Sequence, residues 1–115
     1  MNFIFITTQK AMMHYYPTPP ADVRFLQNTH RHLFKFKVWI EVFHNERDLE
    51  FFLFQNFVEQ VITNISKMGA QAHSCEAISD LLFVEIAGNY CTTDRPRKIR
   101  IEVSEDGENG SYKEY

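Results

Sequence analysis

The stretch His30–Phe43, HRHLFKFKVWIEVF, carries the pattern that decides the fold of this chain. Every second position from Phe34 to Val42 is apolar. Charged residues alternate with them, at Lys35, Lys37 and Glu41. Because successive side chains of a strand point to opposite faces, this alternation predicts a strand with one face packed on a core.

The residues before this strand predict an earlier strand and a long loop. The apolar run Phe3–Ile6 opens a strand that we expect to continue, either regular or bulged, through Met12 and His14. The segment Tyr15–Thr29 contains Pro17, Pro19 and Pro20. Because proline interrupts a helix, we expect this segment to be a loop without helix. A loop this long in a small domain usually has a function.

Two helices are predicted after the central strand. Apolar residues recur at three- and four-residue spacing from Phe54 to Ile65, which predicts an amphipathic helix ending near Met68-Gly69. Ser74 is a suitable N-cap for a second helix, and Gly88-Asn89 is expected to end it. The apolar face of this second helix is Cys75, Ile78, Leu81, Leu82 and Ile86.

The C-terminal part predicts two more strands. Ile99, Ile101 and Val103 alternate with charged residues, Asn109-Gly110 favours a tight turn, and Ser111–Tyr115 forms a short last strand. The expected order is therefore two strands, two helices and two strands. We predict a single α+β domain over residues 1–115, with a four-stranded antiparallel sheet and both helices on one face.

The composition excludes several classes of protein. The chain has 115 residues, 44% hydrophobic and 23% charged, which is typical of one folded domain and not of a disordered chain. Its net charge of −3 lacks a basic excess, so we expect no nucleic-acid partner. The 11 phenylalanines exceed what one small core seems to need, which favours a homo-oligomer.

The cysteines and apolar runs bear on the compartment. Cys75 and Cys91 fit neither a C-x-x-C metal motif nor a disulfide framework, which predicts a reducing, cytoplasmic environment. The run Phe3–Ile6 is too short for a signal peptide or a membrane span, so we expect no membrane association.

Three histidines form the strongest chemical pattern. His30 and His32 stand two residues apart on a strand, so their side chains share a face with Cα atoms about 6–7 Å apart. His14 ends the preceding strand and adds a third imidazole. Three histidines that leave a fourth position open are typical of catalytic zinc sites. The alternative is a partly buried polar pair, because two histidines at this spacing arise readily by chance.

Glu105 is the second candidate site residue. It continues the alternation of Ile101 and Val103 by one more step, so a carboxylate takes the last core-facing position of the strand. Such a carboxylate can accept two parallel hydrogen bonds from a planar, N–H-rich ligand. The alternative is a solvated residue in the acidic turn SEDGENG.

The sequence resembles the family of 6-pyruvoyl-tetrahydropterin synthase and of 6-carboxy-tetrahydropterin synthase, an enzyme of queuosine biosynthesis. The order of elements is similar to the tunnelling fold (T-fold) of that family. The matching residues, along about residues 3 to 115, are His14, His30-Arg31-His32, Phe54, Ser74-Cys75-Glu76, Ile101-x-Val103-x-Glu105 and Tyr112.

The resemblance implies a function and an assembly. It implies that His14, His30 and His32 bind zinc (Zn), and that Glu105 holds the 2-amino and N3 groups of a pterin-like substrate such as dihydroneopterin triphosphate. Members of the family form trimers, often stacked into hexamers. Because the predicted strands and helices already use most of the phenylalanines, the oligomer prediction depends mainly on this resemblance.

The chain also departs from the family at residues of the lyase chemistry. Phe25–Thr29 contains no cysteine where the family has its catalytic thiol, and no L-D-H segment is present. Arg31 replaces a usual glycine, and Leu53 replaces a usual aspartate. His73 is the candidate catalytic base in place of the missing histidine. Either a zinc-dependent lyase or a non-catalytic T-fold module that binds a pterin- or purine-like ligand, or scaffolds an assembly, is expected.

Overall fold

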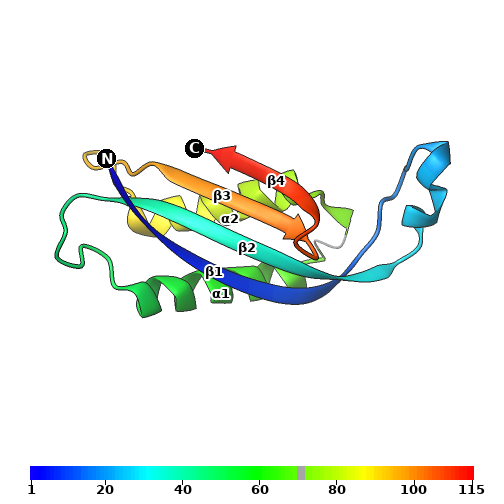
Figure 1. Ribbon diagram of the computed structural model, residues 1–115, viewed down its shortest axis with the longest axis horizontal. Helices are drawn as coiled ribbons and strands as arrows, with labels where there is room; N and C mark the ends of the chain where they lie inside the picture. The colour runs from blue at the N-terminus through cyan, green and yellow to red at the C-terminus, as the bar shows by residue number, and fades with distance from the viewer. Residues whose placement is uncertain (70–71) are drawn as a thin grey trace.

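The computed structural model describes residues 1–69 and 72–115 of the chain. Strand β2 (His30–Val42) is an inner strand of a four-stranded antiparallel sheet with the order β1-β2-β3-β4 (Figure 1). The remaining elements, in chain order, are β1 (Asn2–His14), the 3-10 helix η1 (Ala21–Gln27), α1 (Phe51–Lys67), α2 (Cys75–Tyr90), β3 (Ile99–Glu105) and β4 (Asn109–Glu114). This confirms the α+β class and the antiparallel four-stranded sheet.

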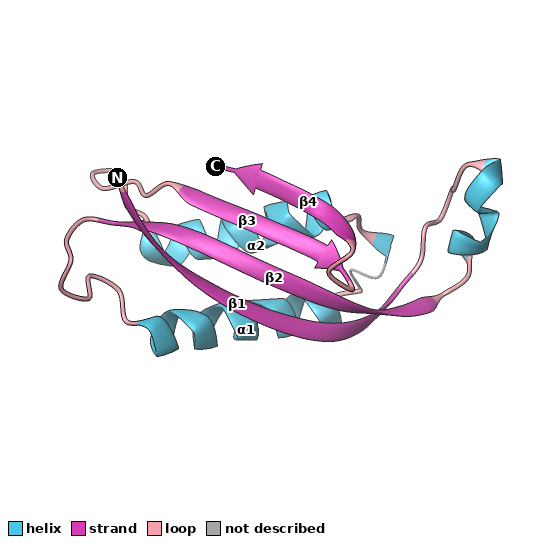
Figure 2. Ribbon diagram, viewed as in Figure 1, coloured by secondary structure: helices cyan, strands magenta, loops and turns pink. Residues whose placement is uncertain are grey.

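The alternation in β2 places the core on one face of the sheet. Its even-numbered residues from Phe34 to Ile40 are at most 2% exposed, and Val42 is 8% exposed. Both helices cover this face, with α1 against β1 and α2 against β3 and β4 (Figure 2). They add buried side chains such as Phe54, Val58, Leu82 and Ile86 to one apolar cluster.

The ends of β1 and β2 at His14 and His30, together with residues 15–29 between them, form an arm that extends beyond β3. Strands β1 and β2 each have 13 residues, whereas β3 has 7. Their pairing runs without interruption from Asn2 opposite Val42 to His14 opposite His30, so β1 is regular and has no bulge. The loop after β1, with η1, therefore projects beyond the helices (Figure 1).

The segment Tyr15–Thr29 corrects one expectation, because its second half does contain a helix. Residues Ala21–Gln27 form η1 directly after Pro20. No proline follows Pro20 here, so backbone N–H groups remain available to close 3-10 turns. The Val23 N–H donates to the Pro20 carbonyl oxygen at 3.0 Å.

The turn between β3 and β4 is also displaced from its predicted position. It lies at Asp106-Gly107, which have φ angles of 59° and 72°, and not at Asn109-Gly110. The pairing of Glu105 with Asn109 continues the ladder and leaves only three residues for the turn. Gly110 lies inside β4, where a Cβ would come within 2.1 Å of the Val103 carbonyl oxygen, so only glycine fits.

The helices differ from their predicted limits at two ends. Helix α1 begins at Phe51 because the Glu50 side chain caps it, accepting from the Leu53 N–H at 2.8 Å. Helix α2 continues past Gly88 to Tyr90. On α2, Leu81 is 40% exposed. Ser79 takes a buried place instead, because its hydroxyl is hydrogen-bonded to the Tyr115 hydroxyl at 2.8 Å.

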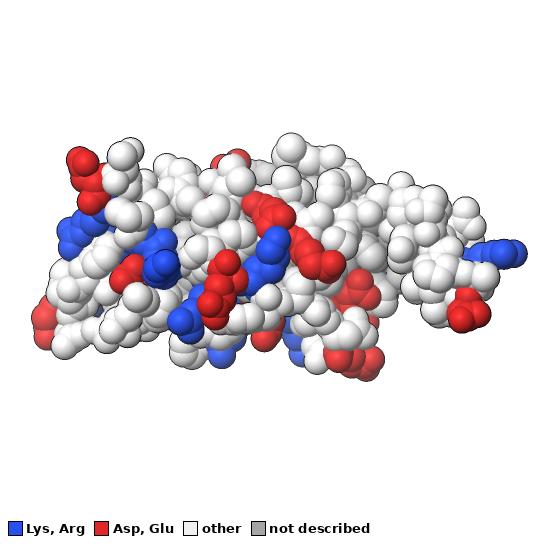
Figure 3. Space-filling view, turned by 90° about the horizontal axis from the view of Figure 1, so that it is seen from above, with Lys and Arg blue, Asp and Glu red and all other residues white. Residues whose placement is uncertain are grey.

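The surface is of mixed charge. On the face that Figure 3 shows, lysines and arginines lie among aspartates and glutamates, whereas the arm is mostly uncharged except near its end. Neither helix in the described part of the chain has the length and apolar character needed to cross a bilayer.

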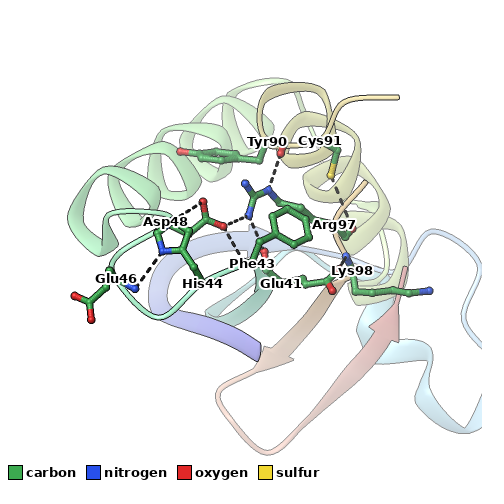
Figure 4. Close-up of polar contacts among 9 residues, drawn as sticks. All are labelled: Glu41, Phe43, His44, Glu46, Asp48, Tyr90, Cys91, Arg97 and Lys98. Carbon is green, nitrogen blue, oxygen red and sulfur yellow. Dashed lines mark hydrogen bonds and ion pairs between the residues drawn. The ribbon is translucent and has the colours of Figure 1, made fainter. Parts of the chain in front are cut away.

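A polar network fixes the end of the sheet opposite the arm (Figure 4). The Asp48 carboxylate accepts from the Phe43 N–H at 2.9 Å and from the Arg97 guanidinium at 3.0 Å. Arg97 also donates to the carbonyl oxygens of Glu41 and Tyr90, at 2.9 and 3.0 Å. One arginine thereby joins the end of β2, the loop before α1 and the end of α2.

This network predicts a pH-dependent stability. The Phe43 N–H and the Arg97 guanidinium hold the pKa of Asp48 below its ordinary value. Because the folded-state pKa is the lower one, this stabilisation is complete above the ordinary carboxyl pKa and is lost as the pH falls through the folded value. We expect Asp48→Asn to lower the free energy of unfolding by about 1–3 kcal/mol near pH 7.

Urea unfolding at about pH 7 and about pH 3 measures this effect, and the two proteins should differ less at the lower pH. Asp22→Asn in the exposed η1 is the control, because it removes a carboxylate outside the network. An equal loss for Asp48→Asn at both pH values would contradict the role of the Asp48 charge.

Candidate metal centre and adjoining pocket

The pairing of β1 with β2 brings three histidines together. His14 is directly opposite His30, and residues opposite each other in an antiparallel pair share a face. His32 lies two residues further along the same face of β2. One ring nitrogen from each histidine lies within 4.8 Å of the others. His14 is buried, and His30 and His32 are partly buried. His30 and His32 lie on the same face of β2 as the buried apolar residues that begin at Phe34.

Backbone carbonyls fix the orientation of two of these rings. The Nε2 atom of His14 lies 2.8 Å from the His73 carbonyl oxygen, and the Nδ1 atom of His30 lies 2.7 Å from the Asn28 carbonyl oxygen. A carbonyl oxygen only accepts hydrogen bonds, so each of these ring nitrogens carries the proton. The opposite nitrogen of each neutral ring therefore has a free lone pair.

A carboxylate does the same for the third ring. The Nδ1 atom of His32 lies 2.7 Å from Asp106 Oδ2 and donates to it. The Leu33 N–H and this ring hold the pKa of Asp106 below its ordinary value. The proton on Nδ1 leaves the lone pair of His32 on Nε2, which points into the cluster.

When the rings are neutral, their lone pairs lie on His14 Nδ1, His30 Nε2 and His32 Nε2. Two of these atoms, His14 Nδ1 and His30 Nε2, are buried without a hydrogen-bond partner among the described residues. Buried polar atoms normally have a partner, and neutral imidazole nitrogens are preferred ligands of zinc and similar divalent ions. The donor set therefore fits a metal ion better than it fits a structural hydrogen-bond network.

Glu105 lies beside these nitrogens. Its Oε2 atom is 3.3 Å from His32 Nε2, and its Oε1 atom is 3.7 Å from His14 Nδ1. On β3 it is paired with Phe34, so the expected step of two along the strand is confirmed. The carboxylate adds negative charge beside the three lone pairs, which a cation would offset.

A cavity of about 460 Å³ adjoins the cluster through His14 and Glu105. Its walls come from three places: the residues that follow β1, the first turn of α2 and the β3–β4 hairpin. The polar and aromatic lining residues are Tyr15, Tyr16, Ser74, Glu76, Glu105 and Asn109. This volume lies in the range of small-molecule sites.

Cys75 lines this cavity but is not an activated nucleophile. Burial, and then the charge of Glu105, raise the pKa of the Cys75 thiol to about 11. A thiol with this pKa stays protonated near neutral pH, whereas catalytic cysteines have lowered pKa values. Cys75 therefore does not replace the cysteine that is missing before His30.

His73 contributes its backbone, and not its ring, to the histidine cluster. The exposed His73 side chain lines a different cavity, of about 420 Å³, between α1 and α2 with Val61, Ile65 and Leu81. The predicted base is thus placed away from the pocket that Glu105 lines.

Three contributors to the site were not predicted, the carbonyls of Asn28 and His73 and the Asp106 carboxylate. A backbone carbonyl has no signature in a sequence. Asp106 did have one, because Asp-Gly is a strong hairpin signal directly after Glu105, but Asn109-Gly110 competes with it.

No protein-family model matches the chain, and no curated protein matches it.

Proposed function

We propose that this chain is a zinc-binding T-fold protein that acts on a pterin-like small molecule, in the manner of 6-pyruvoyl- and 6-carboxy-tetrahydropterin synthases. The observation that carries the proposal is that one ring nitrogen from each of three histidines lies within 4.8 Å of the others, beside a carboxylate and a cavity. The α+β order and the sheet order are consistent with the T-fold.

The residues present fit zinc. His14, His30 and His32 would hold the ion, with Glu105 next to it. Bound zinc would supply a Lewis acid for a substrate oxygen, such as a hydroxyl of the dihydroneopterin triphosphate side chain. The protein's own part is to hold each of the three rings in its own tautomer and to bind the heterocycle.

Glu105 and the cavity support the choice of a planar, N–H-rich ligand. The Glu105 carboxylate lines the cavity and can accept from an amino group and a ring N–H at once. Tyr15 and Tyr16 add aromatic side chains to the lining, against which a flat ring can pack. Pterin is the ligand of this chemistry that the sequence resemblance implies.

A second candidate function is a non-catalytic module with the same ligand. It is favoured because two candidate proton-transfer groups among the described residues are unsuitable: the Cys75 thiol has a raised pKa, and the His73 ring lies at another cavity. Positioned proton transfer contributes roughly 10²–10⁴-fold to a rate, so a protein without it binds ligand with little turnover.

We further propose a cytoplasmic homo-oligomer, a trimer or a hexamer. Both cysteines are free, as expected in a reducing compartment. Strands β1 and β4 are the two edges of the sheet, and an unpaired edge offers backbone groups to a strand of another copy. On the arm, Phe25 is 67% exposed and Tyr16 is 43% exposed, which suits contact with a neighbouring subunit.

The metal prediction is tested first. Protein purified without chelators should contain close to one zinc per chain by elemental analysis, and His30→Ala with His32→Ala should abolish it. His73→Ala is the matched control: it removes a ring but keeps the carbonyl that orients His14, so zinc should be retained. Zinc below about 0.2 per chain in the unmodified protein would refute the metal site.

The ligand prediction is tested with dihydroneopterin triphosphate and zinc-loaded protein. We expect binding that Glu105→Gln weakens by about 10-fold or more, because a neutral amide loses a charge-assisted acceptor. Glu76→Gln at the other side of the cavity is the control for charge.

Product formation in the same assay would exclude the non-catalytic module. Binding without product would support it, and no binding would refute the pterin proposal.

The assembly prediction is tested by light scattering. We expect the mass of three or six chains at micromolar concentration. Phe25→Ser on the arm should shift the protein toward smaller species. A monomer for the unmodified chain would remove the proposed oligomer while leaving the metal site in place.

A further inference from the structure

Asp106 is bound to the start of β2 by three hydrogen bonds. Its Oδ2 atom accepts from the His32 ring at 2.7 Å, and its Oδ1 atom accepts from the Leu33 N–H at 2.9 Å. Its own N–H donates to the Leu33 carbonyl oxygen at 2.7 Å. Since both carboxylate oxygens and the backbone are engaged, the side chain has one fixed position.

The backbone of Asp106 also has a special conformation. Its φ angle of 59° lies in the left-handed region, which aspartate, asparagine and glycine tolerate better than other residues. Gly107 follows with a φ angle of 72°. This turn aims the carboxylate back across the hairpin at His32, one residue after Glu105.

The His32 ring differs from its two neighbours in the charge of its outer partner. His14 and His30 donate to the neutral carbonyls of His73 and Asn28, whereas His32 donates to a carboxylate. A hydrogen bond to a charged acceptor is about twice as strong as one to a neutral acceptor. His32 is therefore the most firmly oriented of the three rings.

Charge balance leads to the same residue. Three neutral imidazoles do not offset the two positive charges of a divalent ion. Glu105 and Asp106 supply two negative charges at the cluster, one beside the lone pairs and one behind a ring. Carboxylates behind metal-binding histidines typically raise metal affinity by 10- to 100-fold.

We infer that Asp106 is a positioning residue of the metal centre, which holds His32 as the Nδ1–H tautomer and thereby sets the metal affinity of the site. The inference rests on the proposed metal-binding function. It goes beyond that function because Asp106, a residue of the β3–β4 turn that does not bind the metal itself, is assigned the role of orienting His32.

The test compares three variants of the full chain. Asp106→Gly removes the carboxylate but keeps a residue suited to a positive φ angle. Asp106→Asn keeps the shape but leaves one neutral acceptor oxygen for two donors, the His32 ring and the Leu33 N–H. Glu108→Gln is the control, because it removes a charge from the same turn but lies outside the His32 contact.

Two measurements are made on each protein. Nitrogen-15 spectra of the metal-free protein at about pH 8, where imidazole is neutral, report the tautomer of His32. Competition with a chromophoric chelator reports the zinc affinity. Thermal unfolding of the metal-free proteins verifies that the fold is retained, and if Asp106→Gly does not fold, Asp106→Asn carries the test.

We expect His32 to be the Nδ1–H tautomer in the unmodified protein and in Glu108→Gln, and to lose this form in Asp106→Gly. Zinc affinity should fall by about 10- to 100-fold in Asp106→Gly, by less in Asp106→Asn, and by under about twofold in Glu108→Gln. An unchanged tautomer, or an unchanged zinc affinity with the fold retained, would overturn the inference but leave the zinc site standing. Failure of the unmodified protein to bind zinc would instead overturn the proposed function and the affinity role with it, while the tautomer spectra would still decide whether Asp106 orients His32.

Discussion

The approach of one ring nitrogen from each of three histidines to within 4.8 Å of the others is the constraint to which the surrounding structure is fitted. Like-signed lone pairs repel, and each buried one lacks a hydrogen bond, so this arrangement costs free energy unless a cation offsets it. Acceptors from three separate segments, at Asn28, His73 and Asp106, nevertheless hold the rings in this orientation. The loop after β1, the segment before α2 and the β3–β4 turn therefore all contact the cluster.

The sequence was sufficient for the elements that depend on periodicity. The alternation in His30–Phe43 predicts the buried face of β2, and continuing its phase backwards predicts that His30 and His32 share that face. The same phase in β3 places Glu105. Side-chain direction in a strand follows from counting residues, so the shared face of His30 and His32 and the core-facing position of Glu105 could be predicted. That His14 and Glu105 meet this pair depends on the register of β1 and β3 against β2, which counting does not give.

The parts that the sequence did not predict depend on competition between local signals or on backbone atoms. Asp106-Gly107 and Asn109-Gly110 are both good turn sequences, and only the pairing of Glu105 with Asn109 decides between them. The prolines of the loop exclude a helix only around their own positions, so they did not predict whether Ala21–Gln27 would be helical. His73 contacts His14 through its backbone carbonyl and not through its ring. Every residue type has such a carbonyl, so the sequence could not predict this contact.

The uninterrupted β1–β2 ladder has a consequence for how the chain finds its native pairing. If β1 slipped by one residue against β2, His14 would turn to the face opposite His30 and His32. The core-facing apolar residues of β1 would become exposed at the same time. A long, regular hairpin has few other features that select one alignment. An ion that binds all three histidines would stabilise only the native alignment, by a free energy that grows with the logarithm of its concentration over its dissociation constant. Ion binding at the cluster would then favour the native alignment of β1 and β2 during folding, independently of any later chemistry at the site.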